Sequence, residues 1–160
     1  MAILERGGSN QKMRAWHGDI PITNHYTAGV GGERFFRELK ENGRIVGGVC
    51  PACRETILPP RLFCERCFET IQELRPVPLP GWIGSVTRVH VDLDGRRLAR
   101  PEWIAFVEFE GVRGGLIHRL EVAGDETPEI GDPVQPVFRP AAERQGGILD
   151  ILHFRTDLGD

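Results

Sequence analysis

Apolar and polar positions alternate over the C-terminal half of the chain, which is the period of a half-buried β-strand. The first alternating segment covers 82–91, and the pair Asp94-Gly95 marks a turn after it. Further strands are expected at 103–109, 116–122, 134–138 and 148–154. Five short strands with glycine-rich corners predict a closed five-stranded barrel of the OB-fold type over residues 82–155, followed by a tail at 156–160.

Within the first strand, strict alternation assigns every second side chain to the same face of the sheet. One face is expected to carry Ile83, Ser85, Thr87, Val89 and Val91, and the other Val86, Arg88, His90 and Asp92.

Ahead of the barrel, one short segment has helical spacing. Residues 33–42, ERFFRELKEN, place Phe35, Phe36 and Leu39 on one apolar stripe, and Gly43 follows as a stop. So short a helix is not stable in isolation, so residues 31–43 are expected to dock on another surface.

Residues 1–30 are polar and rich in glycine without periodicity, which predicts an extended N-terminal arm. The arm also carries Trp16, His17, Ile20, Ile22 and Tyr26. We therefore expect it to lie on its own domain or on a partner.

All four cysteines occur as two CxxC pairs, CPAC and CERC, at Cys50, Cys53, Cys64 and Cys67. This spacing supplies four thiolates to one tetrahedral Zn²⁺ and predicts a rubredoxin-like zinc ribbon over residues 44–75. Disulfides would require a secreted chain, and a redox CxxC usually stands alone beside a βαβ pattern. Neither a secretory leader nor a βαβ pattern is visible, so one structural zinc per chain is the expectation.

The ribbon is followed by prolines at positions 76, 78 and 80, which predict a stiff connector over residues 76–81 and a domain boundary there. The whole chain is thus expected to be mainly β. It would consist of an arm, a docking helix, a zinc ribbon and an OB-fold barrel.

Composition narrows the functional class. No apolar run approaches the roughly 18 residues of a membrane span, and with reduced cysteines a cytoplasmic location is expected. The formal net charge of −3 disfavours nonspecific binding to polyanions.

Catalytic motifs are not evident. The chain has neither a G-x-S-x-G elbow, a P-loop nor a GxGxxG motif, and its cysteines are assigned to zinc. His118 shares a strand face with Leu116, Leu120 and Val122, which favours a partly buried structural histidine over a catalytic base. Catalysis by this chain alone is therefore not expected.

The arginines near the first barrel hairpin leave two ligand classes open. Arg88, Arg96, Arg97 and Arg100 lie near Trp82 and Trp103, as in proteins that bind single-stranded nucleic acid. Asp92, Asp94 and Glu102 interleave with them, however, and the same arginines suit the phosphates of a cofactor such as coenzyme A.

The order of these parts resembles a bacterial and archaeal family of acyl-CoA-associated zinc-ribbon/OB-fold proteins. The resemblance rests on GERFFREL, GRIVG, CPAC, LPPRLFCERC, the proline connector, a GxIxSVTRVH strand and a late GDPVQPVF. It runs from about Gly32 to Phe154, and the PPR before the second knuckle makes it specific.

The resemblance implies a non-catalytic accessory subunit that docks on a thiolase-fold partner, or on a hydratase, and helps to enclose coenzyme A. The longer arm is similar to that of subunits paired with thiolases for aromatic or bulky 3-oxoacyl-CoA. Within this expectation Arg61 and Arg88 are candidate phosphate contacts. Phe35, Phe36, Leu39 and Tyr26 are the candidate partner interface.

Overall fold

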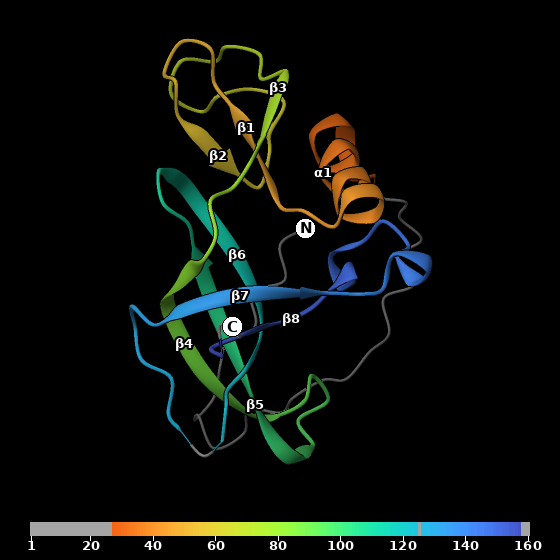
Figure 1. The fold of residues 1–160 in the computed structure, drawn as a ribbon, viewed down its shortest axis with the longest axis vertical. Coiled ribbons are helices and arrows are strands. Elements are labelled where there is room, and N and C mark those ends of the chain that lie inside the picture. Colours follow the sequence, from red (N-terminus) through yellow and green to blue (C-terminus); the bar gives the residue numbers. More distant parts are fainter. Residues whose placement is uncertain (1–26, 125, 158–160) are drawn as a thin grey trace, which may run out of the picture.

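A helix, a three-stranded ribbon and a five-stranded barrel make up the computed structural model, which describes residues 27–124 and 126–157 (Figure 1). The mainly β fold predicted from the sequence is confirmed. Its elements are α1 (Gly29–Asn42), β1 (Val46–Val49), β2 (Thr56–Leu58), β3 (Glu73–Pro76), β4 (Gly81–Val91), β5 (Arg97–Glu108), β6 (Val112–Glu121), β7 (Pro133–Phe138) and β8 (Ile151–Arg155), with two short 3₁₀ turns, η2 (Ala141–Glu143) and η3 (Ile148–Asp150), between β7 and β8.

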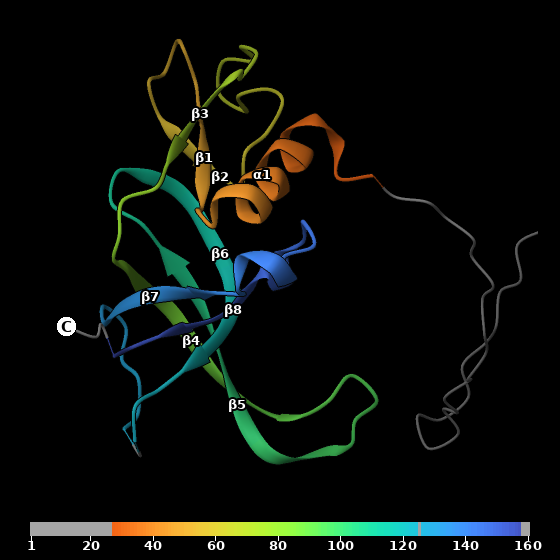
Figure 2. The same cartoon turned by 45° about the vertical axis from the view of Figure 1, so that its right-hand side comes forward.

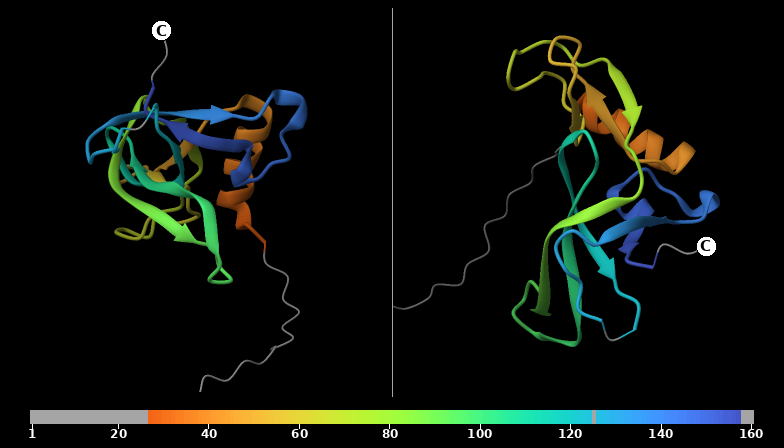
Figure 3. Two further views of the ribbon diagram at one scale, coloured as in Figure 1. Left: turned by 90° about the horizontal axis from the view of Figure 1, so that it is seen from below. Right: turned by 60° about the vertical axis from the view of Figure 1, so that its left-hand side comes forward.

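The barrel consists of β4 to β8 in the order β6-β5-β4-β7-β8. It closes because β8 also pairs in parallel with β6, at Leu120↔Phe154 and Glu121↔Arg155. The fifth strand begins at Ile151, three residues later than expected, since 148–150 form η3. The β4–β5 hairpin projects from the end of the barrel opposite to the ribbon (Figures 2 and 3).

The predicted faces of the first barrel strand are wrong beyond Gly84. The register between β4 and β5 shifts between Ile83 and Ser85, which is a β-bulge. A bulge inserts one residue, so the side chains from Ser85 to Val89 lie on the face opposite to the predicted one, and a second register shift follows between Val89 and Val91. Ile83 is buried, Ser85 and Thr87 are exposed, and Val86 packs against the core.

The ribbon joins the barrel through one parallel strand pair. β2 lies beside β6, with Leu58 opposite Gly114. A β-carbon added at Gly114 would lie 2.1 Å from the carbonyl oxygen of Leu58, and the residue has a φ of +92°. Glycine is therefore required where the two lobes meet.

A single hydrophobic core connects all three parts. Its buried side chains include Leu39 from α1, Val46 and Leu58 from the base of the ribbon, and Val107 and Phe154 from the barrel. The proline connector separates ribbon and barrel along the chain, but their cores are continuous. A second, small cluster consists of Cys50, Ile57, Cys64 and Ile71.

Helix α1 begins at Gly29, four residues before the predicted start. It ends at Asn42, and the following Gly43 adopts a left-handed conformation and donates its N–H to the Leu39 carbonyl at 3.1 Å. Phe35 and Leu39 are 3% and 0% exposed, buried against the chain's own core. These two side chains are thus unavailable to a partner, because the short helix is stabilised by docking on its own barrel and ribbon.

No helix in the described part of the chain is long and apolar enough to cross a membrane.

Candidate functional site

The four cysteines converge at the tip of the ribbon. Their Sγ atoms all lie within 4.8 Å of one another, with Cys50–Cys67 at 3.5 Å, Cys53–Cys64 at 3.8 Å and Cys53–Cys67 at 3.4 Å. Four sulfurs about 2.3 Å from a tetrahedral zinc ion are about 3.8 Å apart. All four are free thiols, because a disulfide would place two sulfurs about 2.05 Å apart.

Each cysteine pair lies in the same kind of turn. The N–H of Arg54 donates to the carbonyl of Cys50, and the N–H of Phe68 donates to the carbonyl of Cys64, each at 2.9 Å. Arg54 and Phe68 have positive φ values of 59° and 63°. The two knuckles are thus equivalent turns that direct four thiols to one centre.

Backbone N–H groups favour the thiolate form at one of the four cysteines. The amides of Arg66 and Cys67 lower the pKa of Cys64 to about 6. The Cys53 thiol, hydrogen-bonded to Cys67 and desolvated, has its pKa raised to about 12. Because neighbouring thiolates repel one another, a divalent cation is the natural group to neutralise all four, and the residues fit one zinc ion. Four thiolates leave no open position for substrate, so such a site stabilises a fold.

An ion-pair network missed by the sequence analysis links the ribbon to the barrel. Arg113 of β6 pairs with Glu55, at 3.1 Å, and with Glu65, both from the ribbon. Glu65 in turn pairs with Arg61, and Glu55 with Arg66. The two ion pairs of Arg113 join residues 48 and 58 positions apart along the chain, so no local motif indicates the link between the lobes. It places Arg61, the first candidate phosphate contact, in an existing ion pair.

The second candidate, Arg88, lies in a different region. Arg88 lies opposite Trp103 in the β4–β5 pair, and Trp103 lies opposite Leu120 near the C-terminal end of β6. Arg61, in contrast, belongs to the ion-pair network at Arg113, near the start of β6. From Arg113 to Leu120 the strand extends roughly 20 Å at about 3.3 Å per residue. The structure therefore separates Arg61 from Arg88.

Around Arg88 lies a cleft of about 630 Å³ lined by residues of β4, β5, β6 and β8, here called the mouth cleft. Its lining includes Arg88, Arg100, Trp103, Arg119, Leu120 and His153. The Arg88 guanidinium lies over the Trp103 ring, 5.4 Å from its centroid. Trp103 itself packs against the main core.

Two barrel histidines, His118 and His153, contact groups of their own barrel. His118 is buried at 7% exposure, its Nε2 is 3.4 Å from the Ile148 carbonyl, and its ring meets the edge of Phe154. Burial lowers its pKa, so the ring is neutral at pH 7. His153 lies 2.8 Å from a carboxylate oxygen of Glu121. His118 is thus a core residue, as its strand face predicted.

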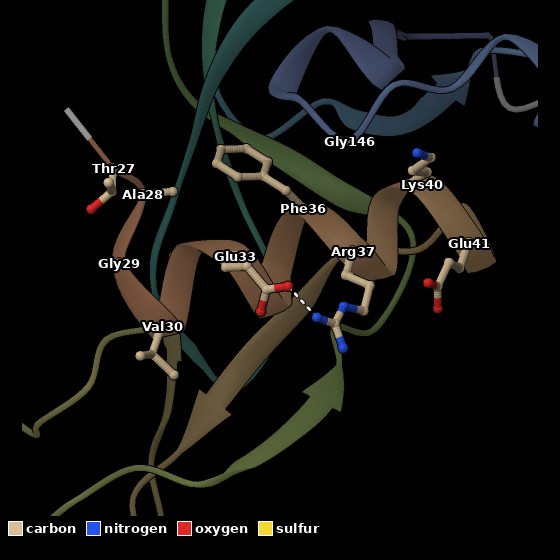
Figure 4. A pocket seen from close by; sticks show the side chains of 10 residues that line it. All are labelled: Thr27, Ala28, Gly29, Val30, Glu33, Phe36, Arg37, Lys40, Glu41 and Gly146. Atoms are coloured by element: carbon tan, nitrogen blue, oxygen red, sulfur yellow. Dashed lines mark hydrogen bonds and ion pairs between the residues drawn. The ribbon is translucent and has the colours of Figure 1, made fainter. Parts of the chain in front are cut away.

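A groove of about 740 Å³ follows the outer side of α1 (Figure 4). We call it the helix groove, and its lining includes Val30, Glu33, Phe36, Arg37, Lys40 and Gly146. Glu33 and Arg37 form an ion pair across one helical turn. Of the predicted partner stripe, only Phe36 reaches this groove, and Tyr26 lies outside the described residues.

Comparison with known proteins places this architecture in a family. A family model for the rubredoxin-like zinc ribbon domain of ChsH2 matches residues 37–72, which include all four cysteines. A crystal structure of a DUF35-family protein of unknown function from Sulfolobus solfataricus is 32% identical, with a TM-score of 0.59. The match covers 68% of this chain and 78% of that one.

The chain belongs to the DUF35 family. This confirms the zinc-ribbon/OB-fold family expected from the sequence. A second DUF35 structure, described as Ltp2-ChsH2(DUF35) aldolase, shares the fold at 23% identity and a TM-score of 0.57, covering 77% of this chain and 92% of that one. No curated protein sequence matches the chain.

Proposed function

We propose that this DUF35 chain is a non-catalytic, zinc-binding accessory subunit of an acyl-CoA-processing complex. It would dock on a thiolase-fold enzyme subunit, with a thiolase for aromatic or bulky 3-oxoacyl-CoA as the candidate, and help to enclose coenzyme A. The partner would supply the nucleophile and the acid–base groups.

The observation that carries the proposal is the family itself, combined with the chemistry of its metal centre. A DUF35 relative is described as part of an aldolase together with Ltp2, which is a precedent for a DUF35 chain in an enzyme assembly. The four-cysteine centre suits folding rather than catalysis, and the histidine most enclosed by the barrel is a core residue. Both points favour a supporting role.

We assign the partner surface to the helix groove. Val30 is 60% exposed, and the groove combines this apolar group and Phe36 with the charged groups of Glu33, Arg37 and Lys40. An apolar centre with a charged rim is the usual anatomy of a protein interface. The groove replaces Phe35 and Leu39 as the proposed contact surface.

Of the two arginines proposed to contact coenzyme A, Arg88 is the better placed. A phosphate at Arg61 would compete with Glu65, whereas Arg88 contacts an indole ring and forms no ion pair with a described carboxylate. We therefore keep Arg88 as the principal contact and Arg61 as a secondary one.

The proposal is tested by purifying the tagged full-length chain from its native cells. Co-purifying proteins are identified by mass, and their stoichiometry is measured on the intact complex. We expect a thiolase-fold partner in a fixed ratio, and acyl-CoA turnover by the complex. A chain that purifies alone, or that turns over acyl-CoA alone, contradicts the proposal.

A matched pair of variants tests the proposed surface. Val30→Asp places a charge in the helix groove, at the helix N-terminus where an acidic residue is tolerated. Ile130→Asp makes the same kind of change at a 72% exposed position on the barrel. We expect Val30→Asp to reduce recovery of the partner at least tenfold and Ile130→Asp to leave it unchanged. Equal recovery with both variants would remove the groove from the interface.

A further inference from the structure

The β4–β5 hairpin extends beyond the rest of the barrel as a two-stranded arm, residues 88–100, here called the hairpin arm. Toward the tip, β6 pairs with β5 only as far as Trp103, and β7 pairs with β4 only as far as Trp82. The tip residue Leu93 is roughly 15 Å from Arg88, at about 3.3 Å per residue. The arm projects away from the ribbon and from α1 (Figure 2).

Hydrogen bonds within the arm fix the turn at its tip. The carboxylate of Asp92 accepts the N–H groups of Asp94 at 2.9 Å and Arg96 at 2.8 Å. An aspartate that binds the backbone of following residues stabilises a turn. Gly95 supplies a φ of +77°. Leu93, within this turn, is 107% exposed. A fully exposed leucine is thus held in a defined position, which reduces the entropy lost when it is bound.

The arm also differs in charge from the rest of the chain. Residues 88–100 contain four arginines and two aspartates, a net charge of +2 with histidine neutral, whereas the whole chain carries −3. Both aspartates are engaged at the tip, Asp92 in the turn and Asp94 at 3.7 Å from Arg96. Arg97 is exposed and forms no ion pair with a described carboxylate. Unmatched positive charge therefore lies directly behind an apolar tip.

This combination favours a protein with an acidic surface over other occupants. Leu93 lies between two aspartates, which the hydrocarbon region of a membrane would exclude. Single-stranded nucleic acid requires aromatic side chains for stacking, whereas the exposed apolar groups of the tip are Leu93 and Val91. Carboxylates around an apolar pocket would complement both the leucine and the arginines.

We infer that the hairpin arm docks on a second protein, with Leu93 in an apolar pocket and Arg97 against carboxylates on the rim of that pocket. The arm lies at the end of the barrel opposite to the ribbon, so it is a contact surface separate from the helix groove along α1 (Figure 2). The inference does not depend on the proposed function, because it specifies the chemistry of the bound surface and not the fold of its owner.

The test is photo-crosslinking by the full-length chain in its native cells, with Leu93 replaced by the photoreactive residue p-benzoylphenylalanine. The same replacement at Ile130, which is 72% exposed, is the matched control. We expect Leu93 alone to crosslink to one protein, at a segment whose neighbours include aspartate or glutamate. A yield no higher than that of the control, or a crosslink to a second copy of this chain, to nucleic acid or to lipid, would overturn the inference.

Charge reversal tests the role of the arginines in the same crosslinking experiment. Arg97→Glu should lower the crosslinking yield at Leu93 about tenfold, because it places like charges together, and Arg97→Lys should retain most of it. Arg75→Glu makes the same change of net charge on the exposed side of β3 in the ribbon. The yield should then change less than about twofold. Equal losses with Arg97→Glu and Arg75→Glu would indicate nonspecific attraction and contradict the docking site.

The inference and the proposed function fail separately. A captured acidic protein without a thiolase fold supports the hairpin arm as a docking element and gives no support to the accessory role. A thiolase-fold partner that co-purifies with the chain but does not crosslink at Leu93 contradicts only the inference.

Discussion

The ribbon and the barrel share one sheet, yet different forces stabilise them. Buried side chains from α1 and from all eight described strands, or their flanks, fill the core around the barrel, whereas the buried cluster at the ribbon tip consists of Cys50, Ile57, Cys64 and Ile71. Two of those four are metal ligands. A lobe with so little apolar burial depends on its metal, while the barrel can fold from packing alone.

Loss of zinc is therefore expected to have the largest effect on the folding of the ribbon. Cys64→Ser removes a thiolate from a centre whose binding free energy is about 10–16 kcal/mol in structural zinc sites. Hydrogen exchange should become fast at residues 48–73 and remain slow in β5 and β6. Zinc content is measured on the same sample, and an intact, zinc-loaded ribbon in this variant would refute the metal's structural role.

Substitutions at two equally buried isoleucines distinguish the ribbon cluster from the main core. Ile57, in the ribbon cluster, and Ile83, in the main core, are both 1% exposed. Ile83→Ala should lower the free energy of unfolding by about 2–5 kcal/mol with zinc still bound. Ile57→Ala should instead weaken zinc retention, because its side chain packs beside the cysteines. Chelator titration and thermal melting measure both properties, and identical profiles for the two variants would show that the lobes are not distinct.

A smaller effect on stability is expected at Asp150, which is 2% exposed. Its carboxylate accepts hydrogen bonds from the backbone N–H groups of Gln145, Gly146 and Gly147. Burial alone would raise the pKa of Asp150, but these hydrogen bonds outweigh it and hold the pKa below its ordinary value of 3.8. A lowered pKa stabilises the fold above pH 3.8, and this stability is lost as the pH falls through the folded-state value.

Asp150→Asn removes that charge. We expect the free energy of unfolding to fall by about 1–3 kcal/mol at pH 7, with the deficit shrinking below about pH 4. Denaturant unfolding at pH 7 and pH 3 measures both values. A deficit that is constant with pH would contradict the role of the ionised carboxylate.

The smallest effect is expected at the ion-pair network between the lobes. Its members are partly exposed, so Arg113→Gln should cost no more than about 1 kcal/mol. Denaturant unfolding in low and high salt measures the difference, which salt should reduce. A cost that is large and independent of salt would show that Arg113 acts through packing.

Features with a fixed local period or spacing were predictable from the sequence. The CxxC pairs gave the metal ligands, and alternation gave the barrel strands and the buried face of His118. The bulge at Gly84 was not predictable, because a glycine in a strand does not reveal which side chains change face. The burial of Phe35 and Leu39 in the chain's own core was not predictable either, because an amphipathic stripe does not indicate which surface covers it. The separation of Arg61 from Arg88 depends on strand pairing across the whole chain.

The accessory role is tested most directly by measuring acyl-CoA turnover for the chain alone, the purified partner alone and the two combined. We expect no turnover by this chain, reduced turnover by the partner and full turnover by the combination. Removing zinc with Cys64→Ser should lower the combined rate to that of the partner alone. Turnover by this chain alone, or a partner whose rate is unchanged by its addition, would contradict the account.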